Sequence, residues 1–137
     1  RSAHAYQQVW TSEGSPLLVL TRRLAARVQA VIDSLRPDSA GQLVVEVGMT
    51  YGNPSRPSAL RKLQAAGARR IVVLPLYPQY SGTTTASVID AVSRWSQQCR
   101  AIPEFRFVNR YHDDPGYIEA LAQRINGLQE PLTIEWE

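Results

Sequence analysis

The stretch that most constrains this chain is Ile71–Thr85, where a short apolar run passes directly into a loop rich in proline, tyrosine and hydroxyl side chains. The run reads Ile-Val-Val-Leu, which is typical of a strand buried on both faces of a parallel sheet. The loop contains Pro75, Pro78 and Gly82 and then leads into a helical pattern. In open α/β sheets, ligands bind in the crevice at the carboxyl ends of the strands. The sequence therefore predicts that this loop carries the binding site.

Helical and strand patterns alternate along the chain. Ser15 and Pro16 begin the clearest helix, because serine caps helices and proline suits the first helical position, and Pro37 ends it. We expect further helices over about residues 57–66, 85–99 and 115–126, and strands over about 43–47, 71–74, 105–108 and 132–136. This alternation favours parallel crossovers. The fold class is therefore α/β, an open parallel sheet of about four strands with helices on both faces, of the flavodoxin or Rossmann three-layer type.

Two of these helices carry an apolar stripe that we expect to face the core, because its members recur at spacings of three and four. The first stripe comprises Leu17, Leu20, Leu24, Val28, Val31 and Leu35, and the second comprises Ile118, Leu121, Ile125 and Leu128.

Length and composition indicate one folded domain over residues 1–137. The chain is 44% hydrophobic and 20% charged, and no apolar run is long enough to span a membrane. Its net charge of +3 comes from arginines spread along the sequence, so we expect no nucleic-acid partner. Cys99 is the one cysteine, and its helical register favours a buried structural thiol. No signal peptide pattern opens the sequence, so we expect a cytoplasmic protein.

Two loops carry the residue types that could bind a flat ligand. Tyr51 lies in the loop 48–55, and Tyr77 and Tyr80 lie in the loop 76–84. Tyrosine offers a broad apolar ring with a polar tip, and neighbouring prolines lower the ordering cost of binding. The helix that follows the second loop could receive a carboxylate or phosphate at its N-terminus. From composition alone, a well-packed structural turn explains the same residues.

Other kinds of site find little support in the sequence. It contains no glycine-rich phosphate-binding motif and no arrangement that suggests a nucleophilic triad. His112 stands beside Asp113 and Asp114, and we interpret it as a solvated turn residue next to a helix cap rather than as a metal ligand. We therefore expect no metal ligand in this chain.

Four segments together resemble one known family. They are Leu-Tyr-Pro-Gln-Tyr-Ser at 76–81, Tyr-Gly-Asn-Pro-Ser at 51–55, Glu-Gly-Ser-Pro-Leu at 13–17 and Tyr-Ile at 117–118. In these segments and their order the chain resembles the bacterial ferrochelatases, lyases that insert ferrous iron into protoporphyrin IX in the last step of haem synthesis. The resemblance covers nearly the whole chain, and the Tyr-Pro-Gln-Tyr-Ser motif is its most specific part.

The resemblance implies a chelatase-like fold of two similar α/β domains with a porphyrin cleft between them. This chain is similar to most of the first domain, without that domain's first strand and without the second domain. The implied porphyrin-binding residues are Tyr51, Tyr77, Pro78, Tyr80, Ser81, Thr83, Ser15 and Pro16. The catalytic histidine and the metal-facing glutamate of the family lie outside this chain, so we expect the parent protein to be an enzyme and this chain to be inactive alone.

The same resemblance sets expectations for cofactors and partners. The substrates are Fe²⁺ and protoporphyrin IX, and no cofactor is expected. Animal-type members bind an iron–sulfur cluster through a cysteine where Gly82 stands here, so no cluster is expected. The partners are the porphyrin, the second domain and, through uncovered apolar surface, a second copy of the chain, with at most peripheral membrane contact. Two alternatives remain at this point: a non-catalytic α/β ligand-binding or interaction module, and a chelatase for another tetrapyrrole.

Overall fold

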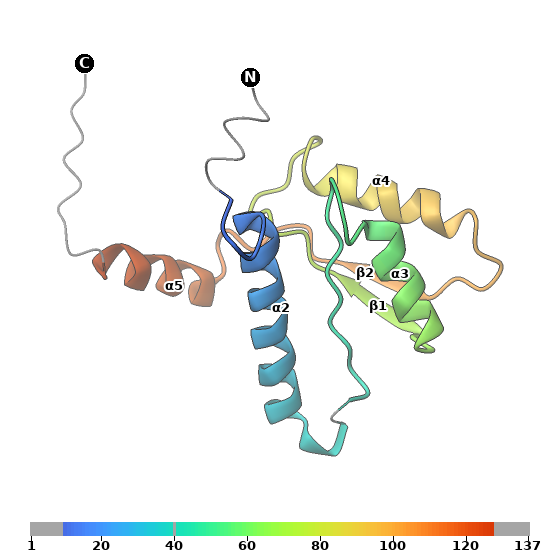
Figure 1. The fold of residues 1–137 in the computed structure, drawn as a ribbon, viewed down its shortest axis with the longest axis horizontal. Coiled ribbons are helices and arrows are strands. Elements are labelled where there is room, and N and C mark those ends of the chain that lie inside the picture. Colours follow the sequence, from blue (N-terminus) through green and yellow to red (C-terminus); the bar gives the residue numbers. More distant parts are fainter. Residues whose placement is uncertain (1–9, 40, 128–137) are drawn as a thin grey trace. The chain divides into compact units, whose positions relative to one another are not determined.

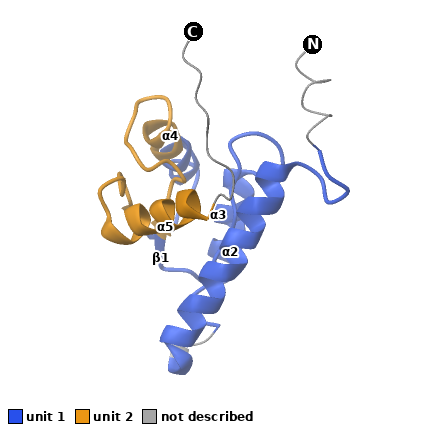
Figure 2. Ribbon diagram, turned by 90° about the vertical axis from the view of Figure 1, so that its left-hand side faces the viewer, with its two compact units in different colours: residues 1–71, 91–104 blue, residues 72–90, 105–137 orange. Residues whose placement is uncertain are grey.

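A computed structural model describes residues 10–39 and 41–127 of the chain (Figure 1). Its elements, in chain order, are α2 (Pro16–Leu35), the short 3-10 helix η1 (Pro37–Ser39), α3 (Arg56–Ala65), β1 (Arg70–Val73), α4 (Thr85–Ser96), β2 (Glu104–Phe107) and α5 (Pro115–Asn126). The chain divides into two compact units (Figure 2). Unit 1 comprises Arg1–Ile71 and Ala91–Glu104, and unit 2 comprises Val72–Asp90 and Phe105–Glu137, so that the division falls within β1, α4 and β2.

In unit 1, α2 has the bounds that its sequence predicts. Ser15 is the N-cap residue, Pro16 occupies the first turn, and the helix ends two residues before Pro37. A tight turn precedes the helix, in which Thr11 and Gly14 exchange two backbone hydrogen bonds of 3.0 Å. Gly14 has a φ of +109°, a region that glycine adopts without the clash of a Cβ atom.

The apolar stripe of α2 does not face the core, so this part of the prediction is wrong. Its six members, which are Leu17, Leu20, Leu24, Val28, Val31 and Leu35, are 37% to 75% exposed. The helix is amphipathic as the periodicity indicates, but a periodic pattern does not specify what covers the apolar face. The neighbouring face of α2, which contains Ala25 and Gln29, is half-buried against residues 43–47.

Residues 43–47, which we expected to form a strand, pair with no other strand in the described part of the chain. The side-chain amide of Gln29 bonds this segment instead: its Nε2 donates to the Leu43 carbonyl and its Oε1 accepts from the Val45 N–H, both at 2.8 Å. A helix side chain therefore satisfies backbone groups that a neighbouring strand would satisfy in a sheet.

The predicted strands around Ile71 and Phe105 are confirmed as β1 and β2. They form a two-stranded sheet, in which Glu104 donates to the Arg69 carbonyl at 2.8 Å and Val108 donates to the Val73 carbonyl at 3.0 Å. The two bonds advance by the same number of residues along both strands, so the pairing is parallel. A sheet of about four strands is thus shown only in part, and the strand expected at 132–136 lies outside the described residues.

Five apolar side chains that are buried lie in the described part of unit 1. They are Ala59, Leu60, Ile71, Val92 and Trp95, from α3, β1 and the second half of α4. At the start of α3, the Ser55 side chain accepts a hydrogen bond of 3.3 Å from the Ser58 N–H, which caps the helix. Helix α4 ends at Ser96 rather than at Cys99. Just after this end, the half-buried Cys99 thiol donates a hydrogen bond of 3.5 Å to the Trp95 carbonyl.

In unit 2, α5 begins where the Asp-Pro pair predicts. The Asp114 carboxylate accepts a hydrogen bond of 3.1 Å from the Tyr117 N–H, and Pro115 occupies the first turn. The described members of its apolar stripe, Ile118, Leu121 and Ile125, are exposed, which contradicts the core-facing prediction; Leu128 lies outside the described residues. Among the described residues, no helix is both long enough and apolar enough to cross a membrane.

Candidate functional site

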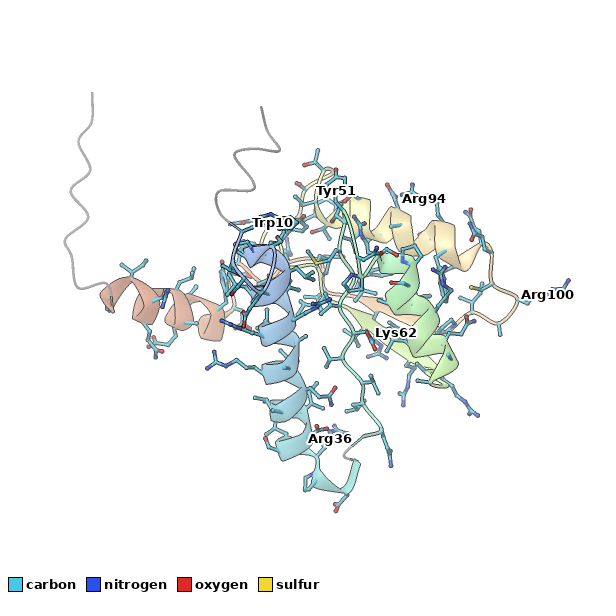
Figure 3. The ribbon with its side chains drawn as sticks, viewed as in Figure 1. Trp10, Arg36, Tyr51, Lys62, Arg94 and Arg100 are labelled. Atoms are coloured by element: carbon cyan, nitrogen blue, oxygen red, sulfur yellow. The ribbon has the colours of Figure 1, made fainter. Side chains whose placement is uncertain are left out.

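The first predicted binding loop belongs to unit 1 and is closed at its base. Met49 donates a backbone hydrogen bond of 2.8 Å to the Pro54 carbonyl, and Met49 and Ser55 form a parallel bridge. Gly48 packs against α3 so closely that a Cβ atom there would lie 3.0 Å from the Cα atom of Arg56. Tyr51 lies near the tip of this loop and is 88% exposed, pointing away from the body of the unit (Figure 3). The loop therefore presents an aromatic ring on a fixed base.

The second loop belongs to unit 2 and joins β1 to α4. Pro75 is buried, whereas Tyr77 and Tyr80 are 40% and 55% exposed. The Pro78 carbonyl accepts a hydrogen bond of 2.9 Å from the Tyr111 N–H, which ties the Tyr-Pro-Gln-Tyr-Ser motif to the turn after β2. Within unit 2, the loop 76–84 therefore lies next to the turn 109–114, beyond the carboxyl ends of β1 and β2. Both tyrosine rings remain open to a ligand on an anchored loop.

A hydroxyl cluster lies at the end of this loop, just before α4. The Ser81 Oγ lies 3.2 Å from the Thr83 Oγ1 and 2.6 Å from the Thr84 Oγ1. The Ser81 carbonyl accepts hydrogen bonds from the N–H groups of Thr84 and Ala86, at 3.3 and 3.2 Å, so the cluster adjoins the first turn of α4. Thr85 is fully buried, and its Oγ1 has no hydrogen-bond partner among the described residues. Rotatable hydroxyls at a helix N-terminus are well suited to donate to an anionic group.

Two further aromatic residues, Tyr111 and Tyr117, support the second loop, and Tyr111 belongs to none of the motifs recognised in the sequence. The rings of Tyr111 and Tyr117 meet edge to face, with centroids 5.3 Å apart. Burial of the Tyr111 phenol raises its pKa above the ordinary value, and the neighbouring Tyr117 raises this pKa further. The signal that could have identified Tyr111 is its position in the strand-end turn just before the Asp-Pro helix start. Tyr111 therefore links the motif loop to α5.

The remaining predicted residues lie at the start of α2. Ser15 and Pro16 are half-buried in unit 1, and the Ser15 side chain makes no capping hydrogen bond. Trp10, just before the turn that leads to them, is exposed (Figure 3). Ser15, Pro16 and Tyr51 thus belong to unit 1, whereas Tyr77, Pro78, Tyr80, Ser81 and Thr83 belong to unit 2.

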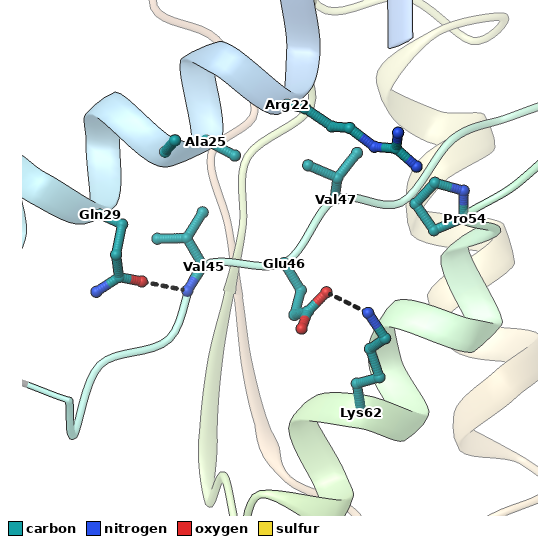
Figure 4. Close-up of a pocket in the computed structure, with 9 residues that line it drawn as sticks. Arg22, Ala25, Gln29, Val45, Glu46, Val47, Pro54 and Lys62 are labelled. Atoms are coloured by element: carbon teal, nitrogen blue, oxygen red, sulfur yellow. Dashed lines mark hydrogen bonds and ion pairs between the residues drawn. The ribbon is translucent and has the colours of Figure 1, made fainter. Parts of the chain in front are cut away.

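A cavity of about 390 Å³ opens in unit 1, and none of the predicted porphyrin-binding residues lines it. Its walls come from α2, residues 45–47, Pro54 and α3 (Figure 4). Within it, the Lys62 Nζ lies 3.2 Å from the Glu46 Oε2. Because the Lys62 side chain is largely exposed, this ion pair adds little to stability.

His112 lies on the turn between β2 and α5, and its Nδ1 is 4.0 Å from the Asp113 Oδ1. Both side chains are exposed, and no group of three or more His, Cys, Asp and Glu side chains in the described part of the chain is arranged to hold a metal ion. In this region the chain offers aromatic rings and hydroxyls rather than a metal-binding cluster.

A parallel strand pair whose strands are each followed by a loop and a helix defines an α/β protein. Residues 1–132 match the family model described as Ferrochelatase. The chain belongs to the ferrochelatase family.

Curated relatives in several bacteria show the same relationship. The chain is 55% identical over 126 residues to the ferrochelatase of Polaromonas sp., a match covering 91% of this chain and 33% of that protein. It is 53% identical over 125 residues to the ferrochelatase of Thioalkalivibrio sulfidiphilus, covering 91% and 33%, respectively. The match to the ferrochelatase of Methylibium petroleiphilum is 46% over 142 residues, covering 99% and 38%. The chain therefore spans about a third of the length of the relatives that it matches.

Proposed function

We propose that this chain is the porphyrin-binding part of a ferrochelatase that inserts Fe²⁺ into protoporphyrin IX. The observation that carries this proposal is the Tyr-Pro-Gln-Tyr-Ser loop of unit 2, whose backbone is anchored at Pro78 while Tyr77 and Tyr80 remain exposed. A porphyrin is flat and largely apolar, so tyrosine rings can cover its face, and its two propionate carboxylates require hydrogen-bond donors. The cluster of Ser81 and Thr83 supplies such donors beside the rings.

Tyr51, Ser15 and Pro16 would contribute from unit 1. Tyr51 offers an exposed ring on a closed loop, and the Ser15 hydroxyl makes no capping bond that a ligand would have to replace. Family membership and the matching order of these segments support their assignment to porphyrin binding.

Metal insertion requires more than porphyrin binding by these loops. The macrocycle loses two pyrrole N–H protons as Fe²⁺ enters, so a base must accept them while the ring is held in a geometry that exposes the nitrogen lone pairs. The resemblance to ferrochelatases implies that the histidine and the glutamate that carry out these steps belong to other parts of the parent enzyme. We therefore propose that the chain alone binds porphyrin weakly and does not metallate it.

The experiment that tests this proposal is a titration of the chain with protoporphyrin IX, followed by the shift of the porphyrin Soret band and by quenching of protein fluorescence. Saturable binding without Fe²⁺ insertion is expected for the chain, and insertion is expected for the longer parent protein. A folded chain that binds no porphyrin would contradict the assignment of the binding loops. A parent protein that binds but does not metallate would contradict the proposed activity, and metallation of another tetrapyrrole instead would favour a different chelatase.

We propose that the partners are the rest of the parent protein and, when that is absent, a second copy of the chain. The exposed stripes on α2 and α5 support both, because contiguous apolar surface is seldom left uncovered. We propose a cytoplasmic location with at most peripheral membrane contact, no nucleic-acid partner and no iron–sulfur cluster; sedimentation, cell fractionation and iron and sulfide analysis of the purified protein test these points.

A further inference from the structure

Arginines from three segments of the sequence gather in unit 1, where β1 and β2 begin. The Gln64 Nε2 donates a hydrogen bond of 3.3 Å to the Ala101 carbonyl, which ties the loop before β2 to the last turn of α3. The Glu104 N–H donates to the Arg69 carbonyl at 2.8 Å, which places the start of β2 beside the start of β1. The arginines in and next to these contacting segments form what we call the arginine patch: Arg61, Arg69, Arg70 and Arg100.

The arginine patch is exposed and carries an excess of positive charge. All four of its residues are exposed, and Arg100 extends away from the body of unit 1 (Figure 3). None of the four forms an ion pair with another residue in the described part of the chain. In residues 61–70 and 97–104, Glu104 is the one acidic residue. The four guanidinium groups therefore remain available to a partner of opposite charge.

The surroundings of the patch favour a peptide over other polyanions. Guanidinium groups bind carboxylates through paired N–H donors, and Ile102, in the same loop as Arg100, is 59% exposed. A peptide side chain can cover this isoleucine, whereas a phosphate backbone cannot. Residues 61–70 and 97–104 contain no aromatic residue on which nucleic-acid bases could stack. One isoleucine is also far less apolar surface than a helix face that enters a membrane.

We infer that the arginine patch is a docking site for an acidic peptide segment of a partner protein. Carboxylates of that segment pair with the four guanidinium groups, and an apolar side chain of the segment covers Ile102. Arginine is also the cationic residue that is enriched at protein interfaces and among their energetically important positions. The patch includes none of the residues proposed to bind porphyrin, so this inference goes beyond the proposed function.

Fluorescence anisotropy with a labelled, leucine-containing oligoglutamate peptide tests this inference on the isolated chain and on the full-length parent protein. The double variant Arg70→Gln with Arg100→Gln should weaken peptide binding about tenfold in both proteins, because two charge-assisted contacts are lost. The matched control is Arg27→Gln with Arg36→Gln, which removes the same number of charges from exposed positions on α2 and at its C-cap. Its dissociation constant should stay within about twofold of the wild type, because salt screens distant charges.

A second comparison separates a peptide site from a general polyanion site. Ile102→Ser should weaken binding of the leucine-containing peptide about threefold, because apolar contact is lost. The same variant should leave unchanged the binding of a peptide in which alanine replaces the leucine. Oligothymidylate and phosphatidylserine vesicles should bind the wild-type proteins more weakly than the leucine-containing peptide does.

Each contrary outcome overturns the inference. Equal losses in the two double variants would show general charge attraction, and an unchanged affinity in Ile102→Ser would remove the apolar contact. Tighter binding of oligothymidylate or of vesicles would assign the patch to a nucleic acid or to a membrane surface. Peptide binding by the chain but not by the parent would show that the rest of the parent covers the patch.

Two measurements keep the test interpretable. If circular dichroism shows that Arg70→Gln with Arg100→Gln unfolds, Arg61→Gln with Arg100→Gln takes its place, because Arg61 lies on the surface of α3 and glutamine retains helix propensity. Porphyrin titration of the same variants should give the wild-type dissociation constant. A failure of peptide binding is therefore distinguishable from a failure of the proposed function.

Discussion

Replacement of Tyr77 by alanine should weaken protoporphyrin IX binding by roughly thirtyfold. A tyrosine side chain presents about 200 Å² of surface, and because 40% of Tyr77 is exposed, about 80 Å² remains for a ligand to cover. At about 25 cal/mol per Å², covering that surface contributes about 2 kcal/mol to binding, which corresponds to a factor of about 30 in the dissociation constant. The anchoring bond between the Pro78 carbonyl and the Tyr111 N–H does not involve the Tyr77 side chain, so the loop should keep its shape in the variant.

The assay is the porphyrin titration, with absorbance and fluorescence as independent readouts. Tyr77→Phe is the matched control, because it keeps the ring and removes the hydroxyl, and its dissociation constant should stay within about threefold of the wild type if the ring face supplies the affinity. If circular dichroism shows that both proteins are folded, equal porphyrin affinities for Tyr77→Ala and wild type would refute the argument that this exposed ring contacts the porphyrin. A loss in Tyr77→Phe as large as that in Tyr77→Ala would assign the effect to the hydroxyl instead.

Three further predictions concern the packing that supports the loops. Trp95 is 5% exposed in the core of unit 1, so Trp95→Ala should lower the free energy of unfolding by about 3–5 kcal/mol in urea denaturation, and a loss below about 1 kcal/mol would contradict that burial. Asp114→Ala should cost about 1 kcal/mol through loss of the α5 cap, whereas Asp114→Asn, which can still cap, should cost clearly less in the same measurement. The raised pKa of Tyr111 favours its protonated form in the folded state, so its contribution to stability is present below about pH 10 and is lost as the pH rises through the higher folded-state pKa. Absorbance at 295 nm during alkaline titration should therefore show a late-ionising tyrosine that is absent in Tyr111→Phe, and an unchanged profile in that variant would disprove the assignment.

Local signals in the sequence predicted the helix boundaries well. Ser15-Pro16 and Asp114-Pro115 mark the starts of α2 and α5, because capping and the fixed φ of proline act within one turn of chain. The strands were predicted less completely, since a strand exists only when a partner lies beside it. The segments around Ile71 and Phe105 pair with each other as β1 and β2. Residues 43–47 also have a strand-like composition, but the side chain of Gln29 on α2 forms hydrogen bonds with their backbone instead.

The same distinction explains what could be predicted of the candidate site. The Tyr77 loop was identifiable from its residue types and from its position after an apolar run. Tyr111 was not, because its role depends on a backbone bond to Pro78, 33 residues away in the chain by their numbers, and on an edge-to-face contact with Tyr117. The burial of the α2 stripe was predicted wrongly for a related reason: periodicity shows which face is apolar, but not whether a partner covers it.

Both loops that we propose to bind porphyrin take their shape from hydrogen bonds within their own units, and this bears on what the isolated chain can do. The loop of Tyr51 is closed by the bond between Met49 and Pro54, and the loop of Tyr77 is held at Pro78 by Tyr111. Neither bond requires the remainder of the parent protein. If porphyrin binding by the chain proves much weaker than binding by the parent, the difference should therefore arise from uncovered porphyrin surface rather than from the cost of ordering the loops. Rigidifying the loops further should then add little affinity, whereas supplying the remainder of the parent protein should restore it.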